Sequence, residues 1–186
     1  NVRPSDLYMI TTDAFKEAQE AGRYVPADGQ VVEIEVTYSK KTVRELKEMP
    51  KGTPALFVNA TQQMAREAIT QLEQLGVSQL SFMPYGPDSP VPEGFEIAVT
   101  PDEADFVPPG MKKVINIGHR PCTAATMIEA AVRLGLEELL EEEAFKQYMR
   151  SMEAKNYSFE KMFLRSQRLE SRIDILLEIL DEGIIG

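Results

Sequence analysis

Residues 54–76, PALFVNATQQMAREAITQLEQLG, decide the fold. Pro54 opens an apolar strand over residues 55–58, and Asn59-Ala60-Thr61 begins a helix that ends at Gly76, because Thr is a favoured N-cap and Gly a favoured C-cap. The apolar side chains of this helix recur at helical spacing, at Met64, Ala68, Ile69, Leu72 and Leu75. We expect that face to pack on a sheet containing the strand, as in an α/β fold.

The same alternation of strand and helix patterns extends from residue 6 to about residue 136. Short apolar or alternating runs predict strands at residues 7–10, 31–38, 80–83, 95–99 and 114–117. Amphipathic segments predict helices at residues 13–21, 42–49 and 123–134. This order predicts an α/β sensory domain over residues 1–135, with an open, mainly parallel, flavodoxin- or Rossmann-like sheet and flanking helices. Two alternatives stay open for residues 1–50, which either complete this sheet or are the remnant of another lobe.

After Gly135 the pattern changes to that of a long helical segment, residues 136–186. Residues 136–181 contain neither proline nor glycine, and we expect an interruption only near Ser158. Spacings of three and four residues predict a coiled-coil seam and a homodimer through this signalling helix, formed by Phe159, Met162, Leu169, Ile173, Leu176 and Leu180. Additional apolar positions, among them Phe163 and Ile175, leave open the alternative that the helix packs on its own domain.

Composition excludes several classes of protein. The 186 residues carry a net charge of −10, so we do not expect this chain itself to bind nucleic acid. A single cysteine, Cys122, and a single histidine, His119, exclude a disulfide framework and a multi-histidine metal centre. We expect no metal and no cofactor. No membrane span or secretory signal is visible, so the cytoplasm is the expected compartment. The start without methionine and the apolar end indicate a fragment of a longer protein.

Candidate ligand-binding residues lie in the loops that follow the strands. Ligands of open parallel sheets bind outside the carboxyl ends of the strands, where these loops converge. The candidates are Thr11, Thr12, Tyr38, Asn59, Thr61, Tyr85, Thr100, Gly118, His119 and Arg120. The same residue types form helix caps and turns in any such fold, and this alternative stays open.

The stretch from Gly118 to Thr123 is the most distinctive. A helix N-terminus beside Arg120 would favour an anion, whereas Arg120 would otherwise pair with a surface carboxylate. Cys122 near a helix start could have a lowered pKa, but a half-buried structural thiol is the favoured interpretation. Asp102 and Glu103 are interpreted as solvated turn residues. Glycine-rich nucleotide motifs are absent, so we expect no catalytic site in this chain.

Two stretches resemble parts of one class of regulator. Residues 179–185, ILDEGII, look like the entry from a linker helix into a PAS domain. Residues 54–136, with Pro84-Tyr85-Gly86-Pro87 and the run Val114-Ile115-Asn116-Ile117-Gly118-His119-Arg120, are similar to a sensory region of bacterial sigma-54-dependent transcription activators. The resemblance implies an amino-terminal sensor that precedes a PAS domain, an AAA+ ATPase domain and a helix-turn-helix domain. It also implies that the full-length protein binds DNA and sigma-54 RNA polymerase.

These patterns predict a non-enzymatic sensory domain of a cytoplasmic transcription activator. It would bind a small ligand, with an anion as one candidate, and relay its state through the C-terminal helix. The alternative is a protein–protein interaction and dimerisation module without a ligand. A third hypothesis is a flavodoxin-like phosphatase or thiol enzyme that uses Cys122.

Overall fold

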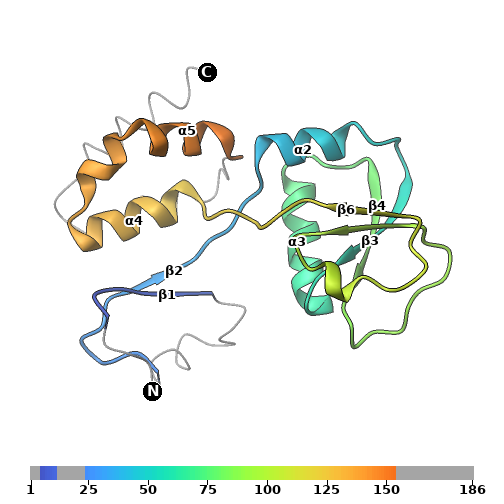
Figure 1. Cartoon of the computed structure of the whole chain (residues 1–186), viewed down its shortest axis with the longest axis horizontal. Coiled ribbons are helices and arrows are strands. Elements are labelled where there is room, and N and C mark those ends of the chain that lie inside the picture. The colour runs from blue at the N-terminus through green and yellow to red at the C-terminus, as the bar shows by residue number, and fades with distance from the viewer. Residues whose placement is uncertain (1–4, 12–23, 154–186) are drawn as a thin grey trace. The chain divides into compact units, whose positions relative to one another are not determined.

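A computed structural model describes residues 5–11 and 24–153 of the chain (Figure 1). The chain divides into two compact units. The second unit is the continuous segment Val36–Pro121, and the first unit comprises Asn1–Glu35 and Cys122–Gly186. The chain therefore passes between the units twice, at residues 35–36 and 121–122. The predicted domain boundary at residue 135 is not one of these points.

A four-stranded, all-parallel sheet forms the centre of the second unit (Figure 1). Its strands run in the order β4-β3-β5-β6. Their bounds are Thr53–Val58 for β3, Leu80–Tyr85 for β4, Ile97–Thr100 for β5 and Lys113–Asn116 for β6. The expectation of a mixed α/β fold with parallel strands is confirmed. Pro84 lies in β4, an edge strand of this sheet, where a missing N–H is tolerated.

Both faces of the central strand β3 are buried, which explains its unbroken apolar run. On one face, Phe57 packs with Ala68 and Leu72 of α3 (Gln62–Gln74) and with Leu46 of α2 (Lys40–Lys47). On the other face, Leu56 and Val58 pack with side chains from β4, β5 and the loops, among them Tyr85, Ala98, Phe95, Phe106 and Met111. Phe106 closes the single-turn 3-10 helix η1 (Ala104–Phe106).

The described part of the first unit contains a parallel strand pair and three helical elements. β1 (Tyr8–Ile10) pairs with β2 (Val31–Glu33). Helix α4 (Ala124–Leu134) begins at Thr123, whose side chain accepts a hydrogen bond from the Thr126 backbone, and it ends at Gly135 with φ of 67°. The 3-10 helix η2 (Glu137–Glu141) and α5 (Glu143–Ser151) follow. The predicted helix over residues 123–134 is confirmed.

The strand predicted over residues 31–38 is shorter in the structure and ends at Glu33. Beyond it the backbone bonds to another part of the chain, because Glu35 O accepts from Thr123 N at 2.8 Å and Glu35 N donates to Thr126 Oγ1 at 2.9 Å. The strands also form two separate sheets, whereas the sequence predicted one. Ser39, and not Thr42, caps α2: its Oγ accepts from Thr42 N at 3.0 Å.

The C-terminal segment is not one continuous helix over its described part. Glu142 is extended between η2 and α5, and Met152 is extended after α5. A continuous α-helix would place Glu137 beside Glu141 and Glu138 beside Glu142, and like charges at this spacing destabilise a helix. The predicted seam residues, 159–180, lie outside the described residues.

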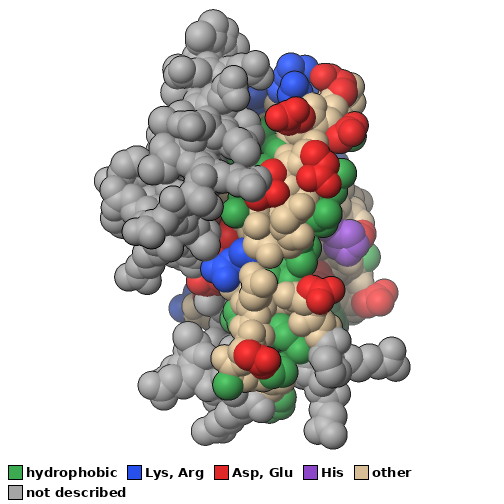
Figure 2. All heavy atoms as spheres, turned by 90° about the vertical axis from the view of Figure 1, so that its left-hand side faces the viewer, with side chains coloured by type: hydrophobic (Ala, Val, Ile, Leu, Met, Phe, Trp, Pro, Cys, Tyr) green, Lys and Arg blue, Asp and Glu red, His purple; other side chains and the backbone are tan. Residues whose placement is uncertain are grey.

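Carboxylate side chains cover more of the described surface visible in Figure 2 than Lys and Arg side chains do, and most of them lie in the upper half of the view. Within the described ranges, no helix combines the length and apolar character that crossing a bilayer requires.

Candidate functional site

The carboxyl ends of the four parallel strands meet at one edge of the sheet in the second unit. The register pairs Val58 with Tyr85, Phe57 with Val99 and Thr100 with Asn116, so the four strands end at nearly the same level. The chain leaves β3 for β4 and then returns across β3 to β5, which makes the gap between β3 and β5 the topological switch point. Ligands of open parallel sheets bind at this position.

Asn59 follows β3 directly at this edge, and only 2% of its surface is exposed. Its backbone N–H donates to Tyr85 O at 3.1 Å, and its side-chain Oδ1 accepts from Ala60 N at 2.8 Å. Its side-chain Nδ2 is buried and has no hydrogen-bond partner among the residues that the structure describes. A buried amide left unpaired destabilises a protein by about 1–3 kcal/mol. Asn59 therefore presents two unused donor hydrogens at the edge where a ligand would bind.

The N-terminus of α3 lies in the same turn as Asn59. Thr61 caps this helix, since its Oγ1 accepts from Met64 N at 3.1 Å. The loop after β4 approaches closely: a Cβ on Gly86 would lie 2.5 Å from Gln62 N, so only glycine fits. Gln62 also bridges this region, because its Nε2 donates to Pro84 O at 3.4 Å and its Oε1 accepts from Arg66 at 3.3 Å.

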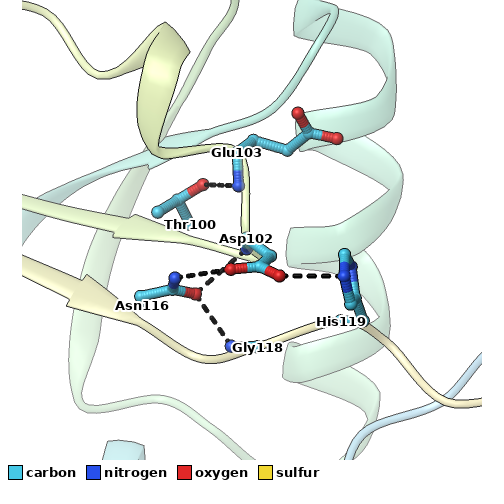
Figure 3. Close-up of polar contacts among 6 residues, drawn as sticks. All are labelled: Thr100, Asp102, Glu103, Asn116, Gly118 and His119. Atoms are coloured by element: carbon cyan, nitrogen blue, oxygen red, sulfur yellow. Dashed lines mark hydrogen bonds and ion pairs between the residues drawn. The ribbon is translucent and has the colours of Figure 1, made fainter.

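A polar network joins the ends of β5 and β6 (Figure 3). Asn116 Oδ1 accepts from Asp102 N at 3.0 Å and from Gly118 N at 2.9 Å, while its Nδ2 donates to Asp102 Oδ1 at 2.7 Å. His119 Nε2 lies 2.8 Å from Asp102 Oδ2, and Thr100 Oγ1 accepts from Glu103 N. Asp102 is an exposed turn residue, as expected, and its side chain also takes part in this network. Asp102 has a φ of 69°. Its carboxylate contacts both Asn116 and His119, and so stabilises the turn that these two residues enclose.

Arg120 and Tyr38 lie away from the carboxyl edge. Tyr38 is buried, and its hydroxyl donates to Ala68 O at 3.0 Å, while Arg120 Nη1 donates to Gln71 Oε1 at 3.5 Å. Ala68 and Gln71 lie about two to three turns along α3 from its N-terminus. Burial raises the pKa of Tyr38 to about 12, although the neighbouring Arg120 guanidinium partly offsets this rise. Arg120 thus contacts a phenol and an amide, and within the described ranges it forms no ion pair with a carboxylate.

The structure brings together only some of the predicted ligand-binding residues. Asn59, Thr61, Tyr85, Thr100 and Gly118 lie at the carboxyl edge of one sheet, and His119 borders them. Tyr85 and Thr100 are buried there as parts of the core. Thr11 lies in the first unit after β1, and Thr12 lies outside the described residues.

Cys122 does not have the properties of an activated nucleophile. Burial raises the pKa of its thiol, and its carbonyl accepts from the Tyr148 hydroxyl at 2.6 Å. This environment fits the structural interpretation of Cys122. Among the described residues, no three His, Cys, Asp or Glu side chains are grouped so that they could hold a metal ion.

Two residues of interest, Asn116 and Arg66, were not predicted. An asparagine two residues before a glycine at a strand end is a signal for an Asx turn, and that signal was available at Asn116. Arg66 gave no such signal, because a helical arginine on a polar face is ordinarily a solvated side chain.

Comparisons of the chain with protein-family models, with curated proteins and with solved structures find no match.

Proposed function

We propose that the chain is a sensory domain that binds a small molecule at the carboxyl edge of the sheet in its second unit. The observation that carries this proposal is the buried, unpartnered Nδ2 of Asn59. The resemblance of residues 54–136 supports a cytoplasmic sigma-54-dependent transcription activator as the parent protein. In this hypothesis the second unit is a flavodoxin- or Rossmann-like module and is not an enzyme.

The place of the unpaired amide supports a ligand more than a packing defect. Asn59 follows the central strand at the topological switch point, where bound molecules are found in this architecture. A ligand acceptor atom at Nδ2 would restore the missing hydrogen bond, so part of the free energy of binding would come from relieving a defect of the free protein. An interaction module without a ligand would gain nothing from this arrangement.

Helix α3 offers a route from this edge to the two connections between the units. Its first turn adjoins Asn59, and its later turns hold Tyr38 and Arg120 through Ala68 and Gln71. Tyr38 lies just after the first connection and Arg120 just before the second. Thr37 N also donates to Pro121 O at 2.9 Å, which ties the two segments together. A small displacement of α3 on ligand binding would move both connections, and the residues after Cys122 lead toward the C-terminal segment.

A thermal-shift screen of small metabolites tests this proposal. A ligand at about 100 times its Kd adds about 2.7 kcal/mol, which for a chain of this size raises Tm by about 5–10 °C. We expect at least one compound to stabilise the wild-type protein and not the Asn59→Leu variant. Arg120→Gln is the matched control, because it changes a polar residue of the same unit away from the edge and should retain the shift.

Failure of every compound, together with an Asn59→Leu variant as stable as the wild type, would favour the interaction and dimerisation module. Homodimerisation through Leu169 and Leu176 stays a prediction, which sedimentation of a double Lys variant would test.

A further inference from the structure

We infer that the ligand presents an oxyanion, a carboxylate or a phosphate group, to the N-terminus of α3 and to the guanidinium of Arg66. This inference rests on the proposed function, because it assigns a chemical class to the molecule bound at the same edge. Its basis is a set of hydrogen-bond donors with no acceptor among the described residues, together with the positive charge of Arg66, whose guanidinium is bonded to the neutral amide of Gln62.

Unused hydrogen-bond donors are present at this position. Asn59 Nδ2 is buried without a partner. The bond from Ala60 N to Asn59 Oδ1 fixes the side-chain amide of Asn59 in the turn that leads into α3. The Nδ2 atom of the same amide group therefore lies in that turn. Within the described residues, no acceptor is bonded to the backbone N–H groups of Gln62 and Gln63, the first two residues of the helix. A group that only accepts hydrogen bonds satisfies such a set, and an ionised oxyanion is of that kind.

The electrostatics favour a negative charge. The N-terminus of a helix carries about half a positive charge, and an acidic residue in the first turn commonly balances it. The first turn of α3 contains Gln62, Gln63 and Met64, and therefore no carboxylate. Instead a cation is held there, since Arg66 Nη2 donates to Gln62 Oε1 at 3.3 Å. An arginine held at the positive end of a helix is unfavourable by itself and becomes favourable when an anion lies between them.

Titration of ¹⁵N-labelled protein with inorganic phosphate and, separately, with acetate at constant ionic strength tests the inference. We expect saturable shifts of the Gln62 and Gln63 amide signals and of the Asn59 side-chain amide signals. The two anions distinguish a phosphate from a carboxylate preference. Arg66→Gln should weaken binding about 1.5-fold to fivefold, the range for an exposed charge pair. The control Arg120→Gln should bind like the wild type, because its side chain lies farther along α3.

A second variant tests the inference through a pKa measurement that needs no added ligand. Asn59→Asp keeps the shape of the side chain and places a carboxyl group where the oxyanion would bind. We expect the pKa of the introduced carboxyl to fall below the ordinary value of about 3.9, and the phosphate response to disappear. A pKa above that value would contradict the inference, since burial without donors raises it.

The outcomes separate the two proposals. If neutral acetamide shifts these signals and the anions do not, the oxyanion inference is wrong while the proposed site stands. Equal weakening by Arg66→Gln and Arg120→Gln would also contradict the inference. If no probe shifts the signals, and a long-lived water at Nδ2 gives the only contact, both proposals are wrong.

Discussion

At the scale of single residues, Tyr38 and Asn59 show why the sequence alone does not distinguish a ligand contact from a core residue. The sequence placed it in a loop as a candidate ligand contact, but its hydroxyl is committed to Ala68 O inside the core. Asn59 was predicted as a ligand contact on the same grounds, but its side-chain Nδ2 has no hydrogen-bond partner among the described residues. The two cannot be distinguished from residue type, because what decides is whether a partner from a distant part of the chain reaches the polar atom.

Ionisation of the Tyr38 phenol also makes the free energy of unfolding depend on pH in the alkaline range. Its pKa is about 12 in the folded protein, above the value of about 10 expected for an unfolded chain. The folded state therefore keeps the proton longer. The resulting stabilisation is fully present below pH 10 and is lost as the pH rises toward 12, by about 3 kcal/mol in total.

Urea unfolding of the wild type and Tyr38→Phe at several pH values between 8 and 12 would measure this effect. We expect Tyr38→Phe to be about 1 kcal/mol less stable at pH 8, where only the hydrogen bond is lost, and to show a smaller fall above pH 10. Arg120→Gln should steepen the fall, since the guanidinium lowers the pKa of Tyr38. Equal slopes for wild type and Tyr38→Phe would contradict the assignment.

At the scale of elements, helices and strands with strong local signals were predictable. Thr61 caps its helix as expected, the helix predicted over residues 123–134 is present, and the apolar run at residues 55–58 forms the central strand. The errors fall where long-range contacts override local patterns. The alternating stretch 31–38 leaves its sheet because Glu35 bonds to Thr123 and Thr126, which lie far away in sequence.

The turn network after β5 and β6 provides an element-scale test. Asn116→Ala removes three hydrogen bonds that hold the positive-φ residue Asp102 and Gly118, and we expect a loss of about 1–2 kcal/mol. Asp102→Asn is the control: Asn also tolerates a positive φ, and the exposed pair with His119 contributes little, so we expect a change within about 0.5 kcal/mol. Chemical denaturation of both variants checks the ranking, and a greater loss for Asp102→Asn would reverse it.

At the scale of the whole molecule, the division into units was not predicted. The sequence suggested one sheet from residue 6 to residue 117, because strand and helix patterns alternate without a visible linker. The structure assigns the later part of this stretch to a unit of its own, Val36–Pro121, with apolar side chains buried on both sides of its sheet. A discontinuous unit leaves little sign in local composition, since its two parts are joined by contacts between residues far apart in sequence, such as those of Glu35 with Thr123 and Thr126.

The continuous unit should fold alone. We expect residues 36–121 to give a dispersed NMR spectrum and a single cooperative urea transition, because the segment carries a core of its own. A matched fragment, residues 53–121, lacks Tyr38, Val43 and Leu46 and should be markedly less stable. An unfolded 36–121 fragment would show that the unit depends on the rest of the chain.

The most direct test of the proposed function is a crystal structure of the protein with the compound that stabilises it most in the thermal-shift screen. We expect an acceptor atom of that compound at about 2.7–3.2 Å from Asn59 Nδ2, at the carboxyl edge between β3 and β5. A compound bound elsewhere, with Nδ2 bonded to protein or to an enclosed water, would contradict the proposal.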